Sequence, residues 1–261
     1  MLILIAESKT MTPCDTPVDR RIFAAHTPVF IDRAGEIMGA LARMPADEVA
    51  ARTRLSAAMV SRLMLMARDF PGTGTGAPAA EVFTGVVFKA FGYGTLDPEA
   101  RARTQEHLAI VSSLYGWLRP ADIVKPYRLD YTTPAAPDGT ALAAWWRGPV
   151  TARLLDTIAA GGHNAVIDML PGDAARCIDW KAVKEHARVF KVDFREMGPG
   201  GATRTPHAGR LKTLRGLMLR HVMVNAIDTP EALAAAETDE CLPTPHGAPG
   251  TITFLTAAPE K

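Results

Sequence analysis

Apolar positions recur along the chain in two spacings, one typical of strands and one of helices. Continuous apolar runs at residues 2–5 and 165–170 predict strands buried on both faces, and the alternation at 189–194 predicts a half-buried strand. Residues 251–255 are a candidate last strand. No internal repeat and no regular strand–helix alternation is present. We therefore expect one compact domain over residues 1–261, of mixed α/β (α+β) class, with a mixed sheet and surrounding helices.

Helical spacing combined with start signals predicts the helices. Ser56 is a candidate N-cap, and Asp97-Pro98 should begin a helix that runs through Val111. The predicted helices inside residues 19–70 would form a helical cap. Further helices are expected at 31–43, from 45 onward, at 140–158, at 211–227 and from 229 onward.

The glycine-rich stretch PGTGTGAP at residues 71–78 resembles a phosphate-binding loop only superficially. No strand directly precedes it, and no Gly-Lys-Ser/Thr sequence follows its glycines. A linker is therefore the better interpretation.

The stretch at residues 112–131, SSLYGWLRPADIVKPYRLDY, is the least ordinary part of the sequence. A predicted helix ends near Ser113, at the beginning of this stretch. Gly116 permits a tight reversal of the chain, and Pro120 suits the first position of a new helix. This predicts a helix-hairpin-helix over residues 101–125, with backbone N–H groups and Arg119 available to a phosphate. A structural helix corner is the alternative, since such hairpins usually carry two glycines and this one has a single glycine.

Composition excludes several classes of protein. The chain is 48% hydrophobic and 22% charged, the balance of a globular protein. Its longest N-terminal apolar run is far shorter than a membrane span requires, and no secretion signal precedes it, so a cytoplasmic protein without membrane contact is expected. Three scattered cysteines predict neither disulfides nor a zinc site, and no other metal or cofactor is indicated.

The net charge of +1 hides an uneven distribution. Residues 181–220 contain ten Lys and Arg against three acids, and five acids without a base follow at 228–240. Solvated helix and strand faces would explain this pattern, and so would an anion-binding wall. The sequence leaves both interpretations open.

Three segments carry a resemblance to a known family: MLILIAESKT, the stretch at 112–131, and KTLRGLMLR at 212–220. Together they resemble the YaaA family of bacterial peroxide-stress proteins. The resemblance implies a helix-hairpin-helix, a basic cleft that binds double-stranded DNA, and a role in limiting oxidative, iron-dependent DNA damage. The positions that match the family pattern are Lys9, Tyr115, Gly116, Arg119, Pro120, Asp122, Pro126, Tyr127, Arg128, Lys212, Arg215 and Gly216.

Three other segments depart from the family pattern. Where the family has Phe-Lys-Gly-Asp-Val-Tyr, residues 83–88 read Phe-Thr-Gly-Val-Val-Phe. The family's Asn-Leu-Ala-Ser-x-Glu-Tyr segment is replaced at 168–174 by Asp-Met-Leu-Pro-Gly-Asp-Ala. The tyrosine and paired lysines of the family have become Arg-Leu-Lys-Thr-Leu at 210–214. The chain is thus expected to be a divergent member.

The first functional hypothesis is a protein that binds double-stranded DNA without sequence preference, through phosphate contacts. Tyr115 and Trp117 would stack on bases, or they would simply belong to the hairpin core. The candidate DNA- or anion-binding residues are Tyr115, Gly116, Arg119, Lys125, Lys212 and Arg215.

The second hypothesis is an enzyme that acts on a small anionic or nucleobase-like substrate. Lys9 follows the first predicted strand, where α/β sheets commonly place their binding crevice. In this interpretation Lys9 is a nucleophile or a cation, and Tyr127 or Asp130 transfers protons. The residues that would hold a carboxylate or phosphate are Arg119, Arg128 and Arg215. Cys177 is a weak candidate nucleophile and is better explained as a buried thiol.

A binding or regulatory module without chemistry is the third hypothesis. What separates the three is whether the cations gather in a closed pocket or spread along an open groove. We expect Lys9, Arg119, Arg128 and Arg215 to share one positive concavity. Nothing in the sequence specifies an oligomeric state.

Overall fold

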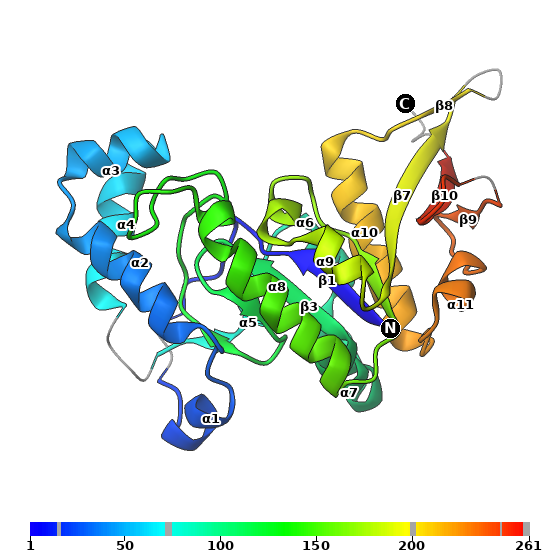
Figure 1. The fold of residues 1–261 in the computed structure, drawn as a ribbon, viewed down its shortest axis with the longest axis horizontal. Helices are drawn as coiled ribbons and strands as arrows, with labels where there is room; N and C mark the ends of the chain where they lie inside the picture. The colour runs from blue at the N-terminus through cyan, green and yellow to red at the C-terminus, as the bar shows by residue number, and fades with distance from the viewer. Residues whose placement is uncertain (15–16, 71–74, 199–201, 246, 258–261) are drawn as a thin grey trace.

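A mixed sheet of eight strands runs through the part of the chain that the computed structural model describes, residues 1–14, 17–70, 75–198, 202–245 and 247–257 (Figure 1). Its strand order is β4-β3-β1-β6-β7-β10-β9, and β8 pairs with β7. The strands are β1 (Leu2–Ala6), β3 (Leu108–Ser112), β4 (Gly116–Leu118), β6 (Ala165–Asp168), β7 (Arg188–Met197), β8 (Thr203–Arg204), β9 (Leu242–Pro243) and β10 (Thr251–Ala257).

The centre of this sheet is parallel and its edges are antiparallel. β3, β1, β6, β7 and β10 are parallel neighbours, whereas β4, β8 and β9 pair antiparallel. The central β1 is covered on both faces, and Leu2–Leu4 are fully buried there. The expected mixed α/β class is thus confirmed. The carboxyl ends of β1, β3 and β6 lie at one edge of the sheet, where a binding crevice is expected.

Helices surround the sheet in separate groups. α8 packs against α9, while α10 packs against α6 and α7. The helices of residues 19–70 gather at the opposite end of the molecule from β10 (Figure 1). The helices are α1 (Arg20–Ala25), α2 (Ile31–Arg43), α3 (Ala46–Thr53), α4 (Ala57–Asp69), α5 (Ala79–Val82), α6 (Val86–Phe91), α7 (Pro98–His107), α8 (Leu142–Ala160), α9 (Trp180–Lys184), α10 (Ala208–Val224) and α11 (Pro230–Ala234), with 3-10 turns η1 (Tyr93–Thr95) and η2 (Ala174–Cys177).

The predicted helix-hairpin-helix at residues 101–125 is wrong. α7 ends at His107, and the next residues form an antiparallel β-hairpin in which Ile110 pairs with Leu118. Gly116 turns the chain with φ +68°, as the expected reversal requires. Pro120 begins no helix, so the hairpin offers no helix N-terminus to a phosphate.

Several local predictions are confirmed. The helix expected at 31–43 has those bounds, and Ser56 caps α4 by accepting the Met59 N–H at 3.4 Å. Residues 71–74 of the expected linker lie outside the described residues. The last two residues of that stretch form β2 (Ala77–Pro78), which pairs with β5 (Ile123–Val124) in a small separate sheet. Within the described ranges, no helix has both the length and the apolar character needed to cross a bilayer.

Candidate functional site

A pocket of about 420 Å³ lies beyond the carboxyl end of β1. The neighbouring helices α6 and α10 approach each other closely because Gly216 has no side chain: a Cβ there would lie 2.3 Å from the carbonyl oxygen of Val87. The close approach of α10 to α6 places Lys212, which belongs to α10, in the wall of the pocket. The pocket is lined by Ala6, Glu7, Ser8, Lys9, Thr10, Thr84, Gly85, Val86, Val87, Phe88, Lys89, Tyr131, Pro171, Asp173 and Lys212.

Glu7 supplies a carboxyl group to this pocket. It comes directly after β1, whose pairing with β3 continues as the Glu7 N–H donates to the carbonyl of Val111 at 2.9 Å. Its Oε2 accepts the backbone N–H of Ser113 at 2.9 Å and the phenolic O–H of Tyr127. Burial raises the pKa of Glu7 to about 7, although these hydrogen bonds oppose the rise.

Tyr127 connects Glu7 to a second hydroxyl. Because the phenolic O–H donates its hydrogen bond to Glu7, the hydroxyl of Ser112, 2.7 Å away, donates to the phenol oxygen. Burial and the nearby Glu7 raise the pKa of Tyr127 well above its usual value, so the phenol keeps its proton at neutral pH. The result is a directed chain of hydrogen bonds, from Ser112 through Tyr127 to Glu7.

Lysine side chains reach the pocket from three separate elements. Lys9 follows β1 and forms an ion pair with Asp130. Lys89 comes from α6 and Lys212 from α10. Arg128 is half-buried beside them and donates to the carbonyl of Lys9 at 3.4 Å. These cations would attract an anionic ligand to a pocket that already contains a carboxyl group of raised pKa.

The pocket unites four predicted site residues. Lys9 and Lys212 line it, Tyr127 bonds to its carboxyl group, and Asp130 pairs with Lys9. All three segments that depart from the family pattern also contribute to its lining, through Thr84–Phe88, Pro171 with Asp173, and Lys212. The wall at residues 84, 86 and 88 is therefore less polar than the family pattern would make it.

The prediction that four cations share one positive concavity is wrong for two of them, Arg119 and Arg215. Arg119 follows β4, and the pairing of Leu118 with Ile110 places it toward the amino end of β3, opposite to the pocket. Arg215 lies on α10 near the buried Asp168 and is absent from the pocket lining. Lys9 and Arg128 alone of the four expected cations lie close together.

Tyr115 and Trp117 belong to the core. Their exposed fractions are 1% and 0%, so neither side chain is available to stack on a base. The Tyr115 hydroxyl accepts the Lys125 backbone N–H at 3.0 Å. The Lys125 ammonium group donates to the carbonyls of Asp69 and Phe70, at the end of α4. Lys125 thus stabilises a helix C-terminus, which is a structural role.

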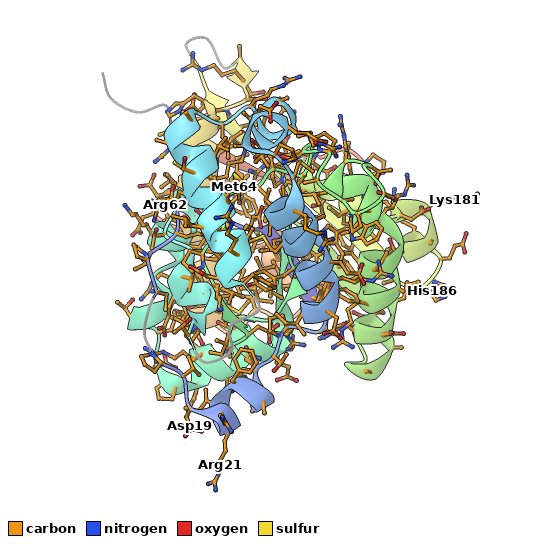
Figure 2. All side chains as sticks on the ribbon, turned by 90° about the vertical axis from the view of Figure 1, so that its left-hand side faces the viewer. Asp19, Arg21, Arg62, Met64, Lys181 and His186 are labelled. Carbon is orange, nitrogen blue, oxygen red and sulfur yellow. The ribbon has the colours of Figure 1, made fainter. Side chains whose placement is uncertain are left out.

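Four of the ten basic residues at 181–220 are neutralised by acids in the described part of the chain. They are arginines, in the pairs Arg188–Glu231, Arg195–Asp193, Arg204–Glu196 and Arg210–Glu240. Lys181 and the nearby His186 project from the α9 region away from the body of the molecule (Figure 2). These ion pairs occupy part of this basic run, so its arginines are not all available to an anion.

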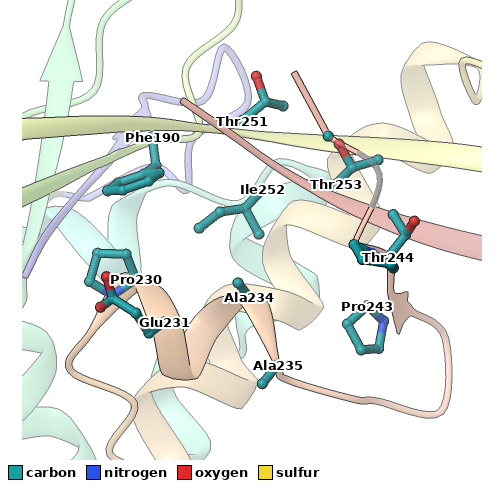
Figure 3. A pocket seen from close by; sticks show the side chains of 12 residues that line it. Phe190, Pro230, Glu231, Ala234, Ala235, Pro243, Thr244, Thr251, Ile252 and Thr253 are labelled. Carbon is teal, nitrogen blue, oxygen red and sulfur yellow. The ribbon is translucent and has the colours of Figure 1, made fainter. Parts of the chain in front are cut away.

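A second cavity, of about 550 Å³, lies between β10 and α11 (Figure 3). Its lining consists of small, apolar and hydroxyl side chains together with Glu231, whose carboxylate is paired with Arg188. Among the described residues that line it, Glu231 is the one charged side chain, so the Glu7 pocket is the stronger candidate site.

The described residues include no cluster of metal ligands, and the Cys177 thiol among them is buried. Among the described residues, no group of three or more His, Cys, Asp or Glu side chains is arranged to hold a metal ion. Cys177 is fully buried, and burial raises its pKa to about 12. The interpretation of Cys177 as a buried thiol is thus confirmed.

Sequence reasoning missed Glu7, Lys89, Tyr131 and Asp173. Glu7 had a usable signal, since it is the first charged residue after a strand buried on both faces. Lys89 and Asp173 had none, because only the packing of α6 and η2 brings them to β1.

Comparison with known proteins agrees with the resemblance carried by the three segments. The family described as peroxide stress protein YaaA matches residues 1–241. The chain is 31% identical over 246 residues to a UPF0246 protein of Bordetella petrii, with 92% of each chain covered. It is 32% identical over 241 residues to a UPF0246 protein of Parabacteroides distasonis, with 90% of this chain and 91% of the relative covered. The chain therefore belongs to the YaaA family of peroxide stress proteins.

Proposed function

We propose that this chain is an enzyme that performs general acid–base chemistry on a small anionic substrate in the Glu7 pocket, as its part in the family's response to peroxide stress. The observation that carries the proposal is the hydrogen-bonded pair of Glu7 and Tyr127 at a pocket lined by three lysines. General bases work best when their pKa lies near the working pH, and the pKa of Glu7 is about 7.

The reaction step is a proton transfer. The ionised carboxylate of Glu7 accepts a proton from an acidic C–H or N–H group of the bound substrate, and the electron pair of that bond stays on the substrate. The Tyr127 O–H stabilises the carboxylate before the transfer. Lys9, Lys89 or Lys212 stabilises the negative charge that the transfer leaves on the substrate.

Exchange of substrate hydrogen for solvent deuterium tests this step without knowledge of the product. A panel of small carboxylate and phosphate anions with acidic C–H groups is incubated with the protein in D2O, and exchange is followed by NMR. We expect catalysed exchange for at least one compound, and a loss of about 10²–10⁴-fold in Glu7→Gln, the range that general bases contribute.

Glu231→Gln is the matched control, because it removes an exposed carboxylate far from the pocket chemistry. It should exchange at the parent rate. Exchange that persists in Glu7→Gln, or a panel in which no anion exchanges or binds, would overturn the proposal.

Binding of double-stranded DNA is a second candidate, favoured by one observation. Lys9, Lys89 and Lys212 reach one pocket mouth from three elements, so they would meet a phosphate backbone together. The buried Tyr115 and the distant Arg119 take no part in this version of the hypothesis. Such binding would be electrostatic and would show no sequence preference.

Fluorescence anisotropy with two duplexes of unrelated sequence, each at two salt concentrations, tests this candidate. DNA binding predicts equal affinities that fall steeply with salt and weaken further in Lys212→Gln. Affinity that ignores salt, or that strongly prefers one duplex, would contradict it.

A further inference from the structure

The Glu7 pocket has an apolar wall as well as its charged groups. Val86 lines the pocket and is 42% exposed, so its methyl groups meet the open space there. Val87 and Phe88 continue this wall along α6, and Pro171 adds to it from the segment after β6. Because apolar surface gains free energy when a ligand removes it from water, the wall suits an apolar part of a ligand.

Two lysines line the same pocket without an acidic partner. Lys89 is three residues after Val86 on α6, so the two side chains are neighbours on one face of that helix. Lys212 comes from α10, which packs on α6. Lys9 pairs with Asp130, whereas Lys89 and Lys212 form no salt bridge with a described residue. Their ammonium groups are therefore available to an anionic group that a substrate brings with it.

The pocket is larger than a bare anion needs. Its volume of about 420 Å³ lies within the range of roughly 300–1,000 Å³ that small-molecule sites in proteins occupy. An inorganic anion on the lysines would leave the methyl groups of Val86 in contact with water. An anion attached to a carbon chain would cover both the lysines and the apolar wall.

We propose that the substrate of the Glu7 pocket is an organic anion with an aliphatic body of several carbons. Its anionic group binds Lys89 and Lys212, and its body packs on Val86. Lys9 is then left to stabilise the charge that the proton transfer creates. This inference rests on the proposed function, since it names the substrate class of the same pocket.

NMR titration at pH 7.5 with straight-chain carboxylates and alkyl phosphates, whose alkyl chains have one to four carbons, tests the proposal. In at least one series, each added CH2 group should raise the affinity about two- to fourfold, the gain from its partial or complete burial. The series that binds more tightly identifies the anionic group. Replacing pentanoate with the uncharged pentanamide should weaken binding by at least ~10-fold, the loss of a charge-assisted contact.

Three variants separate the apolar contact from the charge. Val86→Ser should remove most of the gain with chain length and leave the affinity for the shortest anion unchanged. Lys89→Gln should weaken all members of the series by a similar factor and keep that gain. Val224→Ser is the matched control, because Val224 is also a helical valine with 42% exposure and is absent from the pocket lining. It should bind the series like the parent.

The outcomes distinguish this inference from the proposed function. Affinity that ignores chain length in the parent, a gain that persists in Val86→Ser, or an equal loss of that gain in Val224→Ser would overturn the inference alone. A parent that binds no member of either series would overturn it together with the proposed function. A gain with chain length, combined with no deuterium exchange in the anion panel, would support the substrate class and contradict the proposed enzyme activity.

Discussion

The phenol of Tyr127 donates a hydrogen bond to the carboxylate of Glu7, 120 residues away in the chain. The same phenol packs edge-on against the ring of Tyr115, with ring centroids 5.6 Å apart. The β-hairpin is thus tied to the end of β1. Through Tyr127, the stretch at 112–131 contributes to the candidate site, although the turn of its hairpin is not part of the pocket lining.

Stability should fall as the pH rises through the range in which Glu7 loses its proton. The pKa of Glu7 is about 7 in the folded protein against 4.5 for the unperturbed group, so the folded state holds more protons between these values. The stabilisation is fully present below pH 4.5 and is lost above pH 7, by about 3 kcal/mol.

The measurement is the free energy of unfolding from pH 4.5 to 8 for the parent and for Glu7→Gln. Asp122 contributes a change of the same sign, since its pKa is raised to about 6, so the difference between the two proteins is the informative quantity. We expect Glu7→Gln to lack most of the decline. Parallel curves for the two proteins would contradict this linkage.

Tyr127→Phe should separate the two roles of the phenol. Removing its O–H takes a hydrogen bond from the Glu7 carboxylate, so the pKa of Glu7 should rise above its parent value. The fold should survive, at a cost of roughly 1–3 kcal/mol for the unsatisfied groups. Thermal unfolding and an NMR titration of Glu7 measure the two effects. A lowered pKa of Glu7 would argue against the assigned direction of the hydrogen bond.

Gly116→Ala should be more damaging than the same change at Gly139. Both glycines have positive φ, +68° and +78°, so alanine introduces backbone strain at each. At Gly116 a Cβ would also lie 2.5 Å from the ring of Trp146, while at Gly139 nothing lies within 4 Å. Denaturant unfolding should show about 1 kcal/mol lost at Gly139 and clearly more at Gly116. Equal losses would show that the Trp146 contact is easily relieved.

Gly85→Ala should disturb the pocket more than the fold. A Cβ at Gly85 would lie 2.2 Å from the hydroxyl of Ser8, which holds the turn around Lys9 through its bonds to Thr10. The turn must shift, and anion affinity should drop. Gly172→Ala is the control, because its Cβ would meet no atom within 4 Å. Equal affinities in the two variants would contradict a role of this turn in positioning Lys9.

The sequence predicted correctly those helices and strands whose spacing of apolar residues fits only one kind of secondary structure. The amphipathic spacing at 31–43 specifies a helix, and the helix is there. Residues 108–111, all apolar, suit a buried strand and the last turn of a buried helix equally well. Pairing with β1 and β4 decides in favour of the strand, and this information is not local. The sequence therefore predicted a hairpin of two helices where the structure has a hairpin of two strands. For the same reason Arg119 was expected at the pocket, whereas it lies toward the other end of the sheet.

The sequence also predicted only part of the candidate site. Lys9 was found because it follows a strand, and Tyr127 and Asp130 because they lie in an unusual motif. The raised pKa of Glu7 results from its burial, and the groups that bond to it there, Ser113 and Tyr127, come from the hairpin turn and the segment after the hairpin. No local pattern reveals that burial.

A carbon-detected NMR titration of the Glu7 side-chain carboxyl, assigned by comparison with Glu7→Gln, tests whether Glu7 can transfer protons near neutral pH. We expect a midpoint at about pH 7 in the free protein, because burial opposes ionisation while Tyr127 and Ser113 only partly offset it. A midpoint near 4.5, the value of an unperturbed glutamate, would show that the carboxyl is solvated and would contradict its assignment as the proton-transferring group.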